Sequence, residues 1–402
     1  MTSKSHAITS RFRALDCIDN DVNTNKRYIV PHIYASREPR EPGGFLGNIM
    51  QPPQSHWNAT YWEEGDFVVE DQEILGVPGQ GTMCSLFNTT DQRPGDWVWR
   101  NLFMSPGEEG TSVKWALRSY ATPDCTFEDC DFFAFVKGHS LYISNNQDTT
   151  FDRCTFVRSG GQGLQVAHRP NDKTDGSTSN VGANNLHYTR NPQHVLKDCH
   201  FIDCGDGGVR ASYTATYFDP GTSRNPGTLL VDGCSFVSAF PEAFGHYKSK
   251  SRGALVVTPI GSQNEPLTTP MMERVEITNC LFDYTRGDRS IVNIRSTDEI
   301  LIEDCAFIAR EDHRWAHVKI DSPFNAMGSS KSRQITLRNT HARGDCRLKI
   351  YRREADGGGS VSYSLDQPGK ELVIDAVTGA LISERTLTAP NLDELKKTYY
   401  GS

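Results

Sequence analysis

Cationic, imidazole and phenol side chains recur at similar places along the middle of this 402-residue chain. They alternate with apolar residues in short segments, or flank such segments, so they are predicted to face outward. Stacked in space, they could cradle an anionic polysaccharide; alternatively, they only solvate an outer sheet face. The predicted outward residues are Tyr142, Gln165, Arg210, Asn293, Lys319 and Lys349, flanked by His139, His168, Arg169, Tyr213, Arg295, His317 and Arg347.

A short phrase returns in the segments that must position these residues: an acidic or amide residue, then Cys, any residue and Phe. The phrases at Cys154 and Cys234 change the first residue, and those beginning at Asn101 and Asn339 are degenerate end copies. Eight copies indicate a repeat protein. The four complete copies are Asp129-Cys130-Asp131-Phe132, Asp198-Cys199-His200-Phe201, Asn279-Cys280-Leu281-Phe282 and Asp304-Cys305-Ala306-Phe307.

The spacing of the phrases predicts the kind of repeat. Cys130 and Cys154 are 24 residues apart, and Cys280 and Cys305 are 25 apart, while longer intervals contain inserted loops. Alternating segments such as 275–277 and 292–294 flank the phrases, and they are too short for helices. Two or three short strands in each turn of about 25 residues favour an all-β solenoid, a right-handed parallel β-helix.

This pattern, over roughly residues 67–351, resembles the right-handed parallel β-helices of the pectate-lyase-like superfamily. That group includes polysaccharide lyases, polygalacturonases and the tailspikes of tailed viruses. In such a coil, the Cys and Phe residues of the phrase should form inward ladders, with the thiols buried and free. The resemblance indicates a fold rather than an activity.

The chain divides into three predicted parts. Residues 1–64 show no repeat and are interpreted as an irregular N-terminal arm, a cap or an attachment segment. Residues 65–355 form the β-helix, interrupted by loops at 169–193, 213–227 and 248–271 that all follow the same strand of their turns. Residues 356–402 suggest a small antiparallel β cap, with a short helix at 391–400 that would close the exposed end of the solenoid.

The resemblance to polysaccharide lyases implies one chemistry. In those enzymes a cation neutralises the uronate carboxylate, a base removes the C5 proton and β-elimination follows. The catalytic candidates here are His168, Arg210, Tyr213 and Lys319. Hydrolysis would need paired carboxylates, but the Asp-Asp and Gly-His-Gly motifs of polygalacturonases are missing.

Other classes of function find little support in the composition. A net charge of −8 argues against a nucleic-acid partner, and no segment is apolar enough to span a membrane. The cysteines lack metal-ligand spacing, and the Gly-rich turns do not open helices, so neither a metal nor a cofactor is expected. The first residues lack the apolar core of a signal peptide, which suggests synthesis in a host cytoplasm without export.

These expectations favour a surface protein of a tailed-virus particle, of tailspike or capsid-decoration type. Its predicted partners are further copies of itself, with a trimer favoured, other virion proteins and a host-surface polysaccharide. The alternatives are a secreted lyase acting on acidic glycans and a noncatalytic carbohydrate-binding solenoid.

Overall fold

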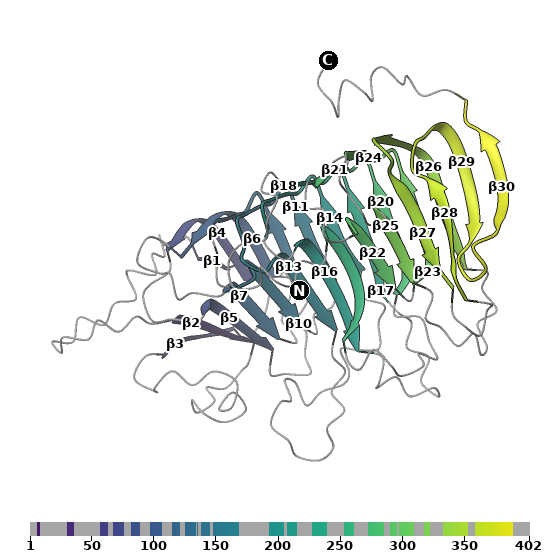
Figure 1. Ribbon diagram of the computed structural model, residues 1–402. Helices are drawn as coiled ribbons and strands as arrows, with labels where there is room; N and C mark the ends of the chain where they lie inside the picture. The colour runs from purple at the N-terminus through teal and green to yellow at the C-terminus, as the bar shows by residue number, and fades with distance from the viewer. Residues whose placement is uncertain are drawn as a thin grey trace, which may run out of the picture.

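The structure is a computed structural model in which strands stack in chain order along one axis (Figure 1). Its described residues are 6–8, 30–35, 57–62, 67–75, 82–88, 97–106, 115–120, 125–133, 135, 138–144, 148–168, 193–204, 207–214, 227–238, 253–260, 272–284, 290–295, 297–308, 317–321, 333–352 and 358–388.

The described strands belong to two sheets. The 18-stranded sheet contains β1 (His6–Ile8), β4 (Phe67–Leu75), β6 (Trp97–Ser105), β8 (Cys125–Glu128), β9 (Asp131–Phe133), β11 (Thr149–Asp152), β12 (Thr155–Val157), β14 (Gln193–Lys197), β15 (His200–Ile202), β17 (Gly227–Asp232), β18 (Ser235–Ser238), β20 (Met272–Thr278), β21 (Leu281–Tyr284), β23 (Thr297–Glu303), β24 (Ala306–Ile308), β26 (Gln334–Arg343), β29 (Gln367–Asp375) and β30 (Leu381–Thr386).

The second sheet has 12 strands. They are β2 (Val30–Ala35), β3 (Trp57–Trp62), β5 (Thr82–Asn88), β7 (Trp115–Tyr120), β10 (Leu141–Ser144), β13 (Gln162–His168), β16 (Gly207–Thr214), β19 (Leu255–Ile260), β22 (Val292–Arg295), β25 (Val318–Asp321), β27 (Arg347–Tyr351) and β28 (Ser360–Ser364).

Each central turn of the chain contributes three strands, as β11, β12 and β13 illustrate. β11 pairs in parallel with β8 and β14, β12 with β9 and β15, and β13 with β10 and β16. The coil therefore has three faces: a first face through β8 to β23, a second face through β9 to β24, and a third face formed by the 12-stranded sheet. The predicted right-handed parallel β-helix is confirmed.

The first residue of the phrase makes the corner between the first and second faces. Asp129, Asp198 and Asp304 each have a φ of 51°, in the left-handed region that Asp and Asn tolerate better than other non-glycine residues. Asn101 and Asn339 have φ values of 50° and 46°, which confirms them as end copies. The sequence analysis missed one further corner, at Asp71 with a φ of 56°, because the residues after it keep neither Cys nor Phe.

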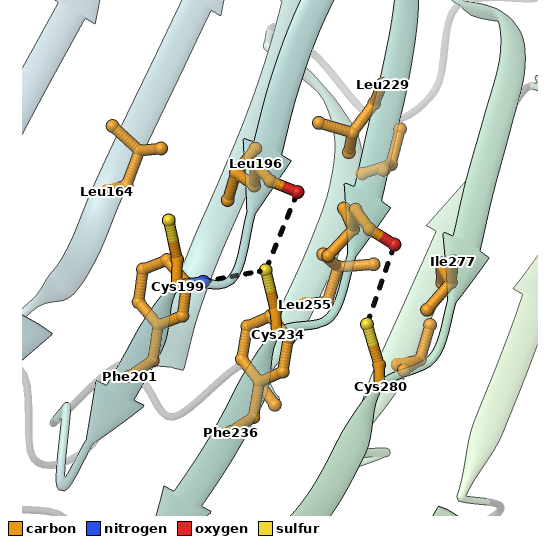
Figure 2. Close-up of a cluster of buried hydrophobic side chains, with 14 of the residues drawn as sticks. Leu164, Leu196, Cys199, Phe201, Leu229, Cys234, Phe236, Leu255, Ile277 and Cys280 are labelled. Carbon is orange, nitrogen blue, oxygen red and sulfur yellow. Dashed lines mark hydrogen bonds between the residues drawn. The ribbon is translucent and has the colours of Figure 1, made fainter. Parts of the chain in front are cut away.

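The Cys and Phe residues of the phrase form the predicted ladders (Figure 2). Cys130, Cys154, Cys199, Cys234, Cys280 and Cys305 are buried free thiols. The Cys234 thiol donates to the Leu196 carbonyl of the preceding turn at 3.6 Å, and accepts from the Cys199 amide at 3.4 Å. Burial raises the pKa of the Cys154, Cys234 and Cys280 thiols, so these cysteines are inert core residues.

Phenylalanine rings stack in register beside the thiols. The centroids of Phe156 and Phe201 are 4.7 Å apart, and those of Phe201 and Phe236 are 4.9 Å apart. The ladder continues at 4.9 Å through Phe282 to Phe307. These separations match the distance between hydrogen-bonded strands, so each turn adds one ring to a continuous apolar column.

Antiparallel strands close the C-terminal end of the coil, as predicted. β28 pairs with β27, while β29 pairs with β26 and β30 with β29. The predicted helix at 391–400 lies outside the described residues. Before residue 65, where no repeat was found, β1 pairs with β4 and β2 with β5. Where the arm ends and the coil begins stays a prediction.

One predicted insertion was placed wrongly. The segment 248–271 was interpreted as a single loop, but it contains β19, whose Leu255 and Val257 are buried. Polar residues on both sides hide this short apolar strand in the sequence. β19 lies between β16 and β22 in the third face, so it supplies the missing strand of its turn.

We expect Gly253→Ala to destabilise the fold by about 3 kcal/mol. Gly253 has a φ of 108°, and an added Cβ would lie 2.1 Å from the Ser290 carbonyl oxygen, which is backbone and cannot rotate away. Gly369→Ala is the control. Gly369 has a φ of 67°, so alanine there has the cost of a left-handed backbone, but no atom lies within 4 Å of the added Cβ. We expect a loss of about 1 kcal/mol. Urea denaturation measures both, and equal losses would contradict the clash.

Candidate functional site

The predicted outward residues of the third face fall into one file along the solenoid. The register runs from Tyr142 to Gln165 and Arg210, then through Val256 to Asn293, Lys319 and Lys349. We call these seven residues the outer file. On each side of Tyr142 in the strand, Leu141 and Ile143 are fully buried, as alternation requires.

The outer file is not uniformly polar or accessible. Val256, which was not in the predicted set, interrupts it and is only 3% exposed, and Gln165 is 6% exposed. Tyr142, Asn293, Lys319 and Lys349 are half-buried. The described members of the file that are partly accessible are therefore Tyr142 at one end and Asn293, Lys319 and Lys349 toward the other.

The four catalytic candidates occupy separated places. His168 and Tyr213 are register partners on β13 and β16. Arg210 and Tyr213 are three positions apart on β16. Lys319 lies three turns beyond Arg210 in the outer file, which is about 14 Å at the usual spacing between strands. Arg169 lies outside the described residues.

Two flanking candidates have other surroundings. His317 is only 2% exposed, and its Nδ1 accepts a hydrogen bond from the Arg347 amide at 3.3 Å. This imidazole ties β27 to the preceding turn and does not lie on the surface, contrary to its predicted place. Arg295 is half-buried on β22, two residues after Asn293 and therefore on the same face.

The C-terminal end of the outer file contains a compact arrangement of charge and aromatic surface. The Lys319 Nζ lies 4.7 Å from the centre of the Tyr351 ring, and the Lys349 Nζ lies 4.9 Å from the same centre. Tyr351 follows Lys349 by two positions on β27, so both residues face outward. Sequence reasoning did not select Tyr351, although its i+2 spacing from Lys349 was visible.

A second surface, on the first face, was also missed. A groove of about 580 Å³ runs over β14, β17, β20 and β23, and Asp232, Glu276 and Glu303 line it. Thr278 Oγ1 and Asn279 Nδ2 donate to Asp232 at 2.7 and 2.8 Å, while Arg338 forms a 2.8 Å ion pair with Glu303. These contacts link successive turns, so Asp232 and Glu303 stabilise the stacking of the coil. The sequence offered a signal for both residues, because each stands two positions before a Cys of the phrase.

The second face carries one row of apolar residues on its outer surface, beside a polar row that includes Asp131, Thr155, His200 and Ser235. Phe133, Val157, Ile202, Val237 and Ile308 occupy register-equivalent outward positions, with Asp283 between the last two. We call these five apolar residues the apolar file. Phe133 is 41% exposed, and Phe103 at the same end is 38% exposed. Burial raises the pKa of the Asp283 carboxyl, and the charge of Arg343 partly opposes that rise.

The comparisons with known proteins agree with this class of fold. The family described as a right-handed beta helix region matches residues 110–251. The searches of curated proteins and of solved structures found no match. The chain therefore contains a right-handed β-helix region.

Within the described ranges, no group of three or more His, Cys, Asp or Glu residues could hold a metal ion. The same ranges contain no helix that is long and apolar enough to cross a membrane.

Proposed function

We propose that this chain is a surface protein of a tailed-virus particle, a β-helical rod that forms a homotrimer and attaches to a host-surface glycan. Successive turns share hydrogen bonds and one apolar core, which makes the rod stiff along its axis. The resemblance to viral tailspikes supports a place in a virus particle. The outward polar residues of the third face support attachment to a glycan. Other virion proteins would hold one end of the rod.

The observation that carries the assembly is the apolar file on the second face. Contiguous apolar residues on an outer sheet surface mark contact sites, because leaving them in water costs free energy. The file runs along the solenoid axis with one residue in each of four consecutive turns, from Phe133 to Val237, and resumes at Ile308 after Asp283. A three-fold axis parallel to the solenoid would bring the same residue of three copies together in each layer, so the occupant that we propose is the chain itself.

Light scattering on the purified chain tests this assembly. We expect three times the 44.8 kDa mass of one chain, and we expect Ile202→Glu to give monomers because three carboxylates would meet in one apolar layer. Asp283→Asn should preserve the trimer, since it removes a charge from the same file. Lys197→Glu, on the first face, is the matched control and should also remain trimeric.

Two results would count against the proposal. An unaltered chain that is monomeric would overturn the trimer. A trimer that survives Ile202→Glu with unchanged mass would show that the copies associate through another surface.

The lyase alternative makes a different demand on the structure. Arg210, Lys319 and a base would have to meet at one uronate, whereas Arg210 and Lys319 are three turns apart. We therefore propose attachment without β-elimination. Incubation with pectate or alginate should produce no unsaturated sugar, measured as ultraviolet absorbance; a signal lost in Arg210→Ala would favour the lyase instead.

A further inference from the structure

The surroundings of Tyr351 differ from the rest of the outer file. Lys319 and Lys349 are register partners on β25 and β27, and each places its ammonium nitrogen less than 5 Å from the centre of one tyrosine ring. One lysine would be enough to cover an aromatic face. The second lysine, on the adjacent turn, places a second positive charge at the same ring.

An anion bound at this ring would lie within reach of both ammonium groups. The ring holds both side chains by cation–π attraction, so less conformational entropy is lost when a ligand binds. All three side chains are half-buried, which leaves part of each accessible to a ligand. The tyrosine hydroxyl is a donor as well as an acceptor, so the arrangement combines two cations, a hydrogen-bond donor and an apolar ring.

We propose that Lys319, Lys349 and Tyr351 form the subsite that binds the anionic group of a glycan, either a carboxylate or a sulfate. The ammonium groups would take the charged oxygens, while the ring would lie against the sugar. This inference rests on the proposed function, because it names the ligand class and the place of glycan attachment. The proposed subsite is only one part of the outer file, because Gln165 and Val256 are almost completely buried.

The overall charge of the chain makes this subsite selective. A net charge of −8 repels a polyanion from most of the surface. Arg295 lies on the same face two turns before Tyr351, but the register position between them is Asp321, so Lys319 and Lys349 supply the excess positive charge here. A polyanion should therefore bind at this end of the third face, and the affinity should fall as salt screens the charges.

Calorimetry with the full chain provides the test. The probes are polygalacturonate for carboxylate, dextran sulfate for sulfate and uncharged dextran as the matched neutral polymer. We expect at least one acidic polymer to bind and uncharged dextran not to bind. Combining Lys319→Ala with Lys349→Ala should weaken the binding of the acidic polymer about tenfold or more. Tyr351→Leu should weaken binding less, because both ammonium groups remain and only the aromatic ring that holds them is lost.

A lysine control separates local contacts from net charge. Lys370 is exposed and pairs with Glu384 at 2.9 Å in the cap, and Lys197 is exposed on the first face, so Lys370→Ala combined with Lys197→Ala changes the net charge by the same amount as the double lysine variant. It should leave the affinity unchanged. Far-ultraviolet circular dichroism of every variant should match that of the unaltered chain, because the replaced side chains lie outside the core.

Each remaining outcome has a defined meaning. Acidic polymers that bind the double lysine variant normally would overturn this subsite and leave the proposed attachment intact. A failure of the unaltered trimer to bind either acidic polymer would overturn both glycan attachment and the subsite. Lysine-dependent binding of a single-stranded oligonucleotide without binding of acidic glycan would replace the glycan with nucleic acid.

Discussion

Replacing Phe132 with alanine should lower the free energy of unfolding of a single chain by about 3–5 kcal/mol, whereas Phe133→Ala should change that of a single chain by less than about 1 kcal/mol, with any further cost in the trimer depending on protein concentration. The two residues are neighbours in β9, yet Phe132 is fully buried and Phe133 is 41% exposed. The Phe132 ring stacks on Phe156 with a centroid separation of 4.9 Å and meets Phe127 edge-on. Removing it leaves a cavity between two turns that the backbone hydrogen bonds prevent from closing.

Urea denaturation followed by circular dichroism measures both changes. The pair is matched in residue type, strand and substitution, so only the face of the strand differs. Equal losses for the two variants would contradict the inward register of the phrase. A loss in Phe133→Ala that depends on protein concentration would instead report the contact between copies, because association contributes to stability by mass action.

Removing Asp298 should be similarly costly, at about 3–5 kcal/mol for Asp298→Ala. Its carboxylate accepts from Arg333 Nε at 3.2 Å, and the two side chains are only 5% and 4% exposed. Asp298 lies in β23 and Arg333 immediately precedes β26 on the next turn. Without the carboxylate, the buried Arg333 guanidinium loses the opposite charge of Asp298. The cost of removing the guanidinium from water then opposes folding.

Two variants provide the comparison for this ion pair. Asp298→Leu combined with Arg333→Met removes both charges and should recover most of the stability. Asp345→Ala breaks the exposed pair with Arg347, whose side chains are 78% and 58% exposed, and should cost less than about 1 kcal/mol. A double variant as unstable as Asp298→Ala would mean that packing, rather than the unpaired charge, causes the loss.

The interior of the coil was predictable because its pattern repeats. Each Cys and Phe of the phrase meets the same residue types one turn away, so a single inference about direction applies to every copy. Asp129 and Asn279 at the corner could likewise be interpreted as turn residues, since Asp and Asn tolerate positive φ. The errors came where the pattern was interrupted, at Asp71 without a Cys and at β19 between polar flanks.

The candidate sites were predictable only in part. Alternation placed Lys319 and Lys349 on one face, but the 4.7 Å approach of Lys319 to Tyr351 depends on pairing between β25 and β27, which are separated by about one turn of chain. Val256 entered the outer file from a segment that had been interpreted as a loop. Inserted residues between turns change which positions become neighbours, and sequence spacing alone does not determine that.

The amino-acid sequence by itself determined the all-β class, the direction of the Cys and Phe ladders and the corner made by the first residue of each phrase. These features follow from local alternation and from a repeat whose copies must bury one another. Only the tertiary structure decided which outward residues share a surface. It buried His317, separated Arg210 from Lys319 by three turns, and brought Lys319 and Lys349 to one ring. The physical reason is that inward positions are selected by the common core, whereas outward neighbours depend on the register of each turn with the next.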